Sequence, residues 1–156
     1  MNRRHSRCRR QLGAAGLGLV ALVATAGCTG PVRSDGVYAS KAAATAEAAA
    51  SAVETAQLAV QETAAGKLFA RSAAQTLAEA ASDAADVQAT FGAIQPPDRR
   101  SEALRGQLDR LLTPAVSTLD DLRTATRRGD LAQLPRIAAP LPRLSVELEQ
   151  FQEAHQ

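Results

Sequence analysis

Histidine, cysteine and aromatic residues are scarce in this 156-residue chain, and their scarcity excludes most kinds of reaction centre. The chain has 2 histidines, 2 cysteines and no tryptophan, and aromatic residues make up 3% of it. Of the two histidines, only His155 lies beyond residue 28, and it is next to last in the sequence. Acid–base catalysis and metal binding both depend on well-placed histidines. We therefore predict no catalytic residue, no metal site and no cofactor, and expect that the protein is not an enzyme.

Sequence motifs of the common enzyme classes are also missing. There is no G-x-S-x-G elbow, no P-loop and no E-x-x-H pair. Carboxylates alone could serve as catalysts or as ligands of a hard cation, and two groups recur at helical spacing. They are Glu79, Asp83 and Asp86, and Glu47 with Glu54. A calcium or magnesium site needs several such oxygens converging in space, so we interpret both groups as solvated helix faces.

The N-terminus has the three parts of an export signal. Residues 1–11 carry five arginines and no acid, residues 12–27 carry no charge, and small residues close the apolar run. This run is too short for a comfortable membrane span, which needs about 20 residues. We predict a signal peptide over residues 1–27, with an uncleaved signal anchor as the alternative.

The end of the apolar run carries the most specific motif of the chain. Thr25, Ala26, Gly27 and Cys28 resemble the lipobox of bacterial lipoproteins, whose usual form is L-A-G-C. Small residues before the cysteine fit the lipoprotein peptidase, and the thiol receives the diacylglycerol. Thr25 departs from the pattern, because a leucine, valine or isoleucine is commoner at that position.

The resemblance implies cleavage between Gly27 and Cys28 and a lipid anchor on Cys28. Two acyl chains hold a protein stably at a bilayer. The resemblance therefore places the protein on the extracytoplasmic face of the cell membrane. Arg9 and Arg10 leave the twin-arginine export route open, although the neighbouring residues favour the general secretory route.

Cleavage would reverse the net charge. The whole chain has a formal charge of +2, but residues 28–156 hold 13 basic and 16 acidic side chains. A nucleic-acid partner would need a basic face, so we predict none. Because Cys8 leaves with the signal and Cys28 carries lipid, no thiol remains for a disulfide or a metal.

Beyond the signal, the sequence predicts a lipidated tether over residues 28–36 and one helical domain over residues 37–156. The tether is rich in glycine, proline and serine. Residues 38–65 are dominated by alanine, and Gly66 offers a helix stop. A first apolar stripe, spaced by threes, fours and sevens, consists of Tyr38, Ala42, Ala49, Val53, Ala56 and Val60. A second stripe recurs every three or four residues, as on an amphipathic helix. It consists of Phe69, Ala73, Leu77, Ala80, Ala84, Val87, Phe91 and Ile94.

The second half of the domain is richer in leucine. Its third helix is predicted to start at Asp98 or Ser101, to be kinked by Pro114 and to end near Gly129. The main stripe is Leu104, Leu108, Leu111, Ala115, Leu119 and Leu122, and Glu102–Arg105 and Asp120–Arg123 are predicted ion pairs. Asp130 and Gln133 resemble a capping box. A short helix, a break near residues 139–142 and a last helix to about Ala154 follow.

These segments predict an all-α fold, namely an up-and-down antiparallel bundle of about four helices, preceded by a signal helix. The last helix is interrupted by prolines. A single rod formed by the first two segments is the alternative to a hairpin at Gly66.

The body resembles small alanine- and arginine-rich lipoproteins of high-GC bacteria. We expect a scaffolding or protein-interaction role with a protein partner in the cell envelope. The alternative is a small-ligand-binding accessory lipoprotein of a transporter or sensor.

Overall fold

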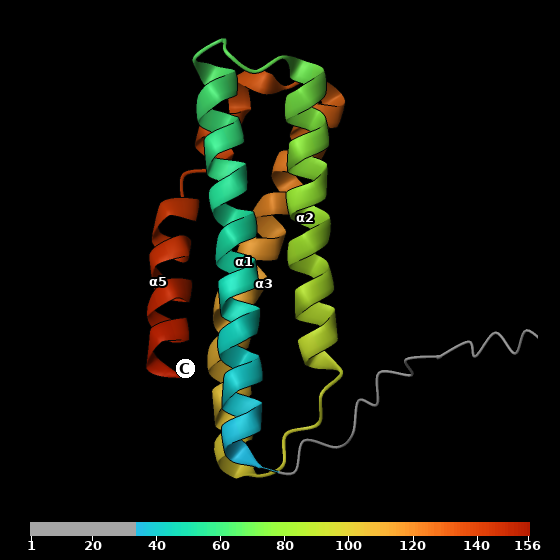
Figure 1. Cartoon of the computed structure of the whole chain (residues 1–156). Helices are drawn as coiled ribbons and strands as arrows, with labels where there is room; N and C mark the ends of the chain where they lie inside the picture. The colour runs from blue at the N-terminus through green and yellow to red at the C-terminus, as the bar shows by residue number, and fades with distance from the viewer. Residues whose placement is uncertain (1–33) are drawn as a thin grey trace, which may run out of the picture.

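The computed structural model describes residues 34–156 and confirms the all-α prediction. These residues form five α-helices and one 3₁₀ turn and contain no strand. The predicted signal helix lies outside the described residues. The elements, shown in Figure 1, are α1 (Asp35–Ala64), α2 (Ala70–Gly92), α3 (Arg99–Arg128), η1 (Leu131–Gln133), α4 (Leu134–Ile137) and α5 (Leu141–Ala154).

Helix α1 begins inside the residues that the sequence assigns to the tether. Ser34 is its N-cap, and the Ser34 hydroxyl accepts a hydrogen bond from the Val37 N–H at 3.3 Å. Asp35 follows in the first turn, where a carboxylate interacts favourably with the helix dipole. The tether expected over residues 28–36 therefore ends before Asp35.

The turn after α1 forms a hairpin and not the alternative single rod. α1 ends at Ala64, and Gly66 adopts φ +72°, a left-handed conformation that glycine reaches without a steric penalty. The N–H groups of Lys67 and Leu68 both donate to the Glu62 carbonyl, at 2.9 and 3.1 Å. These bonds satisfy the end of α1 and reverse the chain direction.

Helix α3 has the predicted ends. The Asp98 carboxylate accepts the Ser101 N–H at 2.7 Å, and Gly129 closes the helix with φ +80°. Arg127 and Arg128 lie in the last turn, where cations offset the negative end of the dipole. Pro114 lies inside α3, which continues through it as one 30-residue helix.

The C-terminal third is broken where the prolines predict a break. α4 spans four residues, a turn follows at residues 138–140, and α5 ends at the predicted Ala154. The predicted capping box is wrong. The Asp130 side chain makes no capping bond; instead the Asp130 carbonyl accepts the Gln133 N–H at 3.0 Å, which forms the 3₁₀ turn.

The helices pack around α1. Helices α2 and α5 flank it on opposite sides, and α3 crosses behind and contacts all three (Figure 1). At 1.5 Å per residue, α1 and α3 are about 45 Å long, whereas the 14 residues of α5 span about 21 Å. Helix α5 therefore leaves one end of α1 and α3 uncovered.

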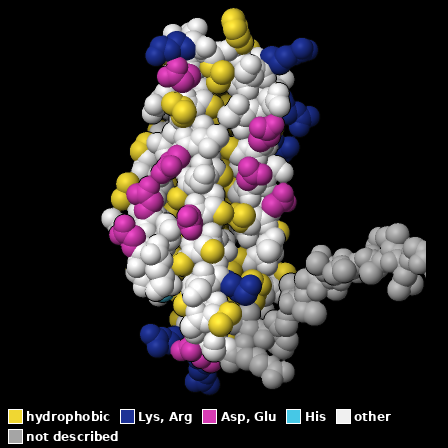
Figure 2. Space-filling model, viewed as in Figure 1, with side chains coloured by type: hydrophobic (Ala, Val, Ile, Leu, Met, Phe, Trp, Pro, Cys, Tyr) yellow, Lys and Arg dark blue, Asp and Glu magenta, His cyan; other side chains and the backbone are white. Residues whose placement is uncertain are grey.

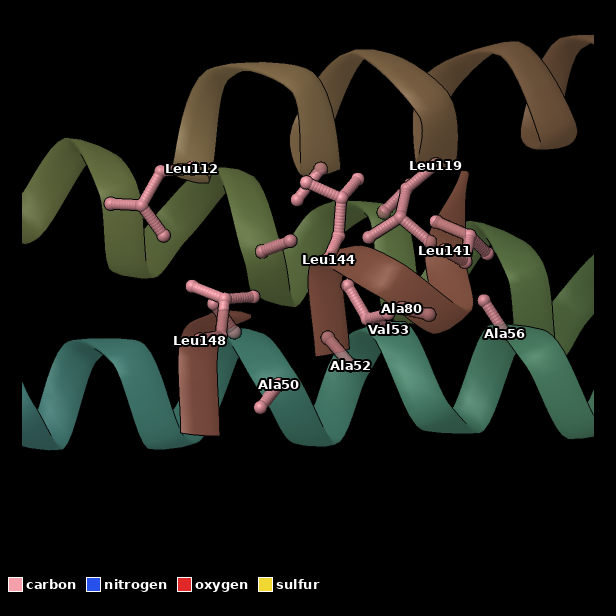
Figure 3. Packing of buried hydrophobic residues seen from close by; sticks show 14 of the residues in the cluster. Ala50, Ala52, Val53, Ala56, Ala80, Leu112, Leu119, Leu141, Leu144 and Leu148 are labelled. Carbon is pink, nitrogen blue, oxygen red and sulfur yellow. The ribbon is translucent and has the colours of Figure 1, made fainter. Parts of the chain in front are cut away.

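Leucines of α3 and α5 fill the core against small residues of α1. In Figure 3, Leu144 and Leu148 of α5 lie beside α1, and Leu112 and Leu119 of α3 lie in the interior of the bundle. These four leucines and Leu141 are at most 1% exposed. The core cluster runs from Tyr38 to Phe151 through all four long helices. Residues 34–156 thus share one continuous hydrophobic core, and we expect them to fold as one unit.

Two residues that the sequence predicts to be in the core, Phe69 and Leu111, are not fully buried. Phe69, placed in the second stripe by its spacing, is 83% exposed because α2 begins one residue later. Of the two adjacent leucines in the middle of α3, Leu112 is fully buried, while Leu111 is only partly buried against the core. Leu108, Leu119 and Leu122 are fully buried, as predicted.

Candidate functional site

The predicted lipidation and cleavage residues, Gly27 and Cys28, lie outside the described residues. Helix α1 begins at Asp35, seven positions after Cys28. The start of α3 lies at the end of the bundle where α1 begins, and α5 runs toward that end (Figure 1). We call this the tether end, and the opposite end, with the α1–α2 turn, the distal end.

A cavity of about 310 Å³ lies at the tether end, in the space that α5 leaves uncovered. It is partly open to solvent and mixes polar with apolar side chains. The His155 Nδ1 lies 2.7 Å from the Phe151 carbonyl oxygen, and the two rings stack with centroids 4.4 Å apart. The lining residues are Asp35, Gly36, Ala39, Arg100, Ser101, Ala103, Leu104, Gln107 and His155.

Polar contacts beside this cavity are mostly structural. The Ser101 N–H and hydroxyl hold the pKa of Asp98 below its usual value, because both bonds favour the carboxylate. Arg105 donates to the Gly92 carbonyl at 2.6 Å and lies 3.9 Å from the Asp109 carboxylate. The predicted Glu102–Arg105 ion pair is thus wrong, whereas Asp120 and Arg123 do form the predicted pair.

The carboxylates singled out in the sequence do not form a metal centre within residues 34–156. Glu79, Asp83 and Asp86 are exposed on α2, and Glu47 and Glu54 are exposed on α1. No group of three or more metal-ligating side chains in this part of the chain could hold an ion. A shallow groove of about 150 Å³ separates the outer faces of the two helices, lined by Ala48, Ser51, Ala52, Thr55, Thr76, Glu79, Ala80 and Asp83.

One polar cluster joins α1 to α5 and was not predicted from the sequence. The Ser145 hydroxyl donates to the Glu54 carboxylate at 3.2 Å across 91 residues of sequence. A hydrogen bond shared with Glu54 raises the pKa of Glu149, and partial desolvation and the charges of Glu54 and Glu153 act in the same direction. Folding therefore increases the proton affinity of the Glu149 carboxyl group.

We predict that Glu149→Gln stabilises the bundle at neutral pH. A raised pKa in the folded state stabilises the fold below the ordinary carboxyl value of 4.5, and this stabilisation is lost as the pH rises through the raised pKa. Gln mimics the protonated form, so the melting temperature of the variant should depend less on pH than that of the parent. Thermal melts across this range test it, with Asp86→Asn on α2 as the control for removing one charge. A Glu149→Gln curve parallel to the parent curve would contradict the assignment.

Comparison with known proteins does not assign this chain to a family. No protein-family model, no curated protein and no solved structure matches this chain. Within residues 34–156, no helix is both long and apolar enough to span a bilayer.

Proposed function

We propose that this protein is a lipoprotein, anchored to the cell membrane through Cys28, that presents its helical bundle to a protein partner in the envelope. The observation that carries the proposal is the sequence Thr25-Ala26-Gly27-Cys28, in which the first three residues close the uncharged run over residues 12–27 and Cys28 follows it. The bundle begins at Asp35, so the lipid and the folded domain are separated by only a few residues.

The described surface supports a binding role better than a catalytic one. His155 is held against Phe151 near the C-terminus, and the acidic residues of α2 face solvent. In contrast, the outer faces of α1 and α2 carry small side chains around a shallow groove. Small side chains allow another helix to approach closely. A helical segment of a partner is therefore the ligand type that we propose for this face.

Cys28→Ala should abolish lipidation. The variant loses the only thiol that can accept the diacylglycerol at the proposed cleavage site, so it should not incorporate an alkyne fatty acid. Metabolic labelling of cells that express the parent or the variant measures this incorporation. Cys8→Ala is the matched control and should label like the parent. Equal labelling of parent and Cys28→Ala would refute the anchor.

A second candidate function is favoured by the cavity at the tether end. Its volume of about 310 Å³ lies at the lower end of the range for small-molecule sites. Arg100, Gln107 and His155 supply polar groups, and Leu104 with two alanines supplies apolar surface. Because Asp35 also lines the cavity and offsets the charge of Arg100, such a site suits a small amphipathic ligand held for a neighbouring transporter or sensor.

The cavity hypothesis predicts that a bulky lining residue blocks binding. The dye 8-anilinonaphthalene-1-sulfonate should gain fluorescence with the parent, and Ala103→Trp should remove most of this gain by filling the space. Ala48→Trp, in the groove between α1 and α2, is the control. Unchanged dye fluorescence in Ala103→Trp would exclude this cavity as the site.

A further inference from the structure

The distal end combines an exposed aromatic ring with an excess of positive charge. Phe69 is the most exposed of the large apolar side chains among the described residues, at 83%. Residues 62–71 and 124–136 meet at this end, where η1 and α4 cross from α3 toward α5 (Figure 1). They hold the cations Lys67, Arg71, Arg127, Arg128 and Arg136 against only two carboxylates, Glu62 and Asp130.

The charge pattern is specific to this end of the bundle. At the tether end, residues 34–41 and 93–102 hold three cations and three carboxylates, so the charges balance. Between the two ends, residues 42–61 of α1 and residues 72–92 of α2 contain acids and no lysine or arginine, whereas α3 and α5 carry charges of both signs. Figure 2 shows one face of the molecule, on which most dark blue side chains lie near the two ends and most magenta side chains lie between them.

The α1–α2 turn holds Phe69 outward on a fixed backbone. Leu68 packs against the core, while the N–H groups of Lys67 and Leu68 are bonded to the Glu62 carbonyl. Lys67 also lies 3.7 Å from the Glu62 carboxylate. Because its neighbour is anchored inward, the Phe69 ring is presented to solvent by the turn.

The start of α2 adds backbone N–H donors that no side chain caps, next to the Phe69 ring. Phe69 is the N-cap of this 23-residue helix and cannot cap it through a side-chain bond, and the first turn contains no acid. The first N–H groups of α2 and the positive end of its dipole therefore lie between Lys67 and Arg71. Phosphate oxygens are natural acceptors for such groups.

We propose that the distal end docks on an anionic phospholipid bilayer. The boundary between headgroups and acyl chains accepts an aromatic ring, and the headgroup phosphates attract the surrounding cations. The turn lies about 45 Å along α1 from the tether end. A bundle anchored at its tether end would thus contact a second bilayer. The docking itself does not depend on the lipid anchor.

Vesicle capture tests the proposal without the Cys28 anchor. Residues 34–156, which contain the complete core, are displayed by an N-terminal hexahistidine tag on neutral vesicles with nickel-chelating lipid. A second, fluorescent population contains phosphatidylcholine alone or phosphatidylcholine with phosphatidylglycerol. Dense display makes weak contacts additive. The proposal predicts capture of the anionic vesicles and not of the neutral ones.

Substitutions at the distal end identify the surface. Arg127→Gln/Arg128→Gln should reduce capture on the order of tenfold, and Phe69→Ala should reduce it by a similar factor. Lys41→Gln/Arg99→Gln removes the same charge at the tether end, outside the cavity, and Leu58→Ala removes an exposed apolar side chain elsewhere, so both should capture like the parent. All five chains should melt cooperatively. Equal capture of neutral and anionic vesicles would overturn the proposal, as would equal losses in the distal-end variants and their controls.

Discussion

Leu112→Ala should lower the free energy of unfolding by about 2–5 kcal/mol, a large share of the roughly 5–15 kcal/mol of a typical domain. Leu112 is 0% exposed and lies on α3, facing the interior of the bundle in Figure 3. The alanines of α1 have no long side chain that could move into the space. The cavity left by the substitution should therefore remain largely open, which adds to the cost of the lost apolar contact.

Leu111→Ala provides the sharpest comparison, because it makes the same chemical change one residue earlier. Leu111 is partly buried, so its truncation should cost less than about 2 kcal/mol. Leu58 is 59% exposed on α1, and Leu58→Ala should change stability by less than about 0.5 kcal/mol. Chemical denaturation of residues 34–156 measures all three. If Leu111→Ala destabilises more than Leu112→Ala, α3 must be rotated so that Leu111 and not Leu112 faces the core.

Tyr38→Ala should be at least as damaging, with an expected cost of about 3–5 kcal/mol. Tyr38 is 0% exposed near the start of α1, and its ring lies 5.2 Å from that of Phe91 at the end of α2. Few other large side chains hold these two helices together near the tether end. Losing the ring should therefore loosen the first turns of α1 and the last turns of α2 together.

Tyr38→Phe separates the ring from the hydroxyl. The hydroxyl oxygen is buried and has no hydrogen-bond partner among the described residues, and burial raises the pKa of Tyr38, with Asp109 adding to the rise and Arg105 opposing it. Removing an unpaired polar atom should leave stability within about 1 kcal/mol of the parent or raise it. Denaturation curves of both variants test this. A loss in Tyr38→Phe as large as that in Tyr38→Ala would show that the hydroxyl stabilises the fold.

Much of the fold could be predicted because helical periodicity is a local property. The buried side of α1, from Tyr38 to Val60, follows from spacing alone, and Gly66, Asp98 and Gly129 mark real helix ends. The errors occur where spacing is ambiguous. Adjacent leucines at 111 and 112 differ by about 100° around a helix, so either could face the core.

Other features depend on how distant segments meet. Phe69 fits the stripe of α2 by number, yet the helix begins after it and the side chain turns outward. The Ser145–Glu54 bond joins residues 91 positions apart, and no local pattern predicts it. The cavity at the tether end exists because α5 is shorter than its neighbours, which becomes visible only when the helices are assembled.

We propose that lipid on Cys28 holds the bundle at a membrane. Intact-mass measurement of the protein extracted from membranes of the producing cell, followed by fragmentation of its N-terminal peptide, is the decisive test of this anchor. We expect a chain that begins at Cys28 and carries a diacylglycerol on that sulfur. A chain that retains residues 1–27, or one that begins elsewhere with an unmodified Cys28, would contradict it.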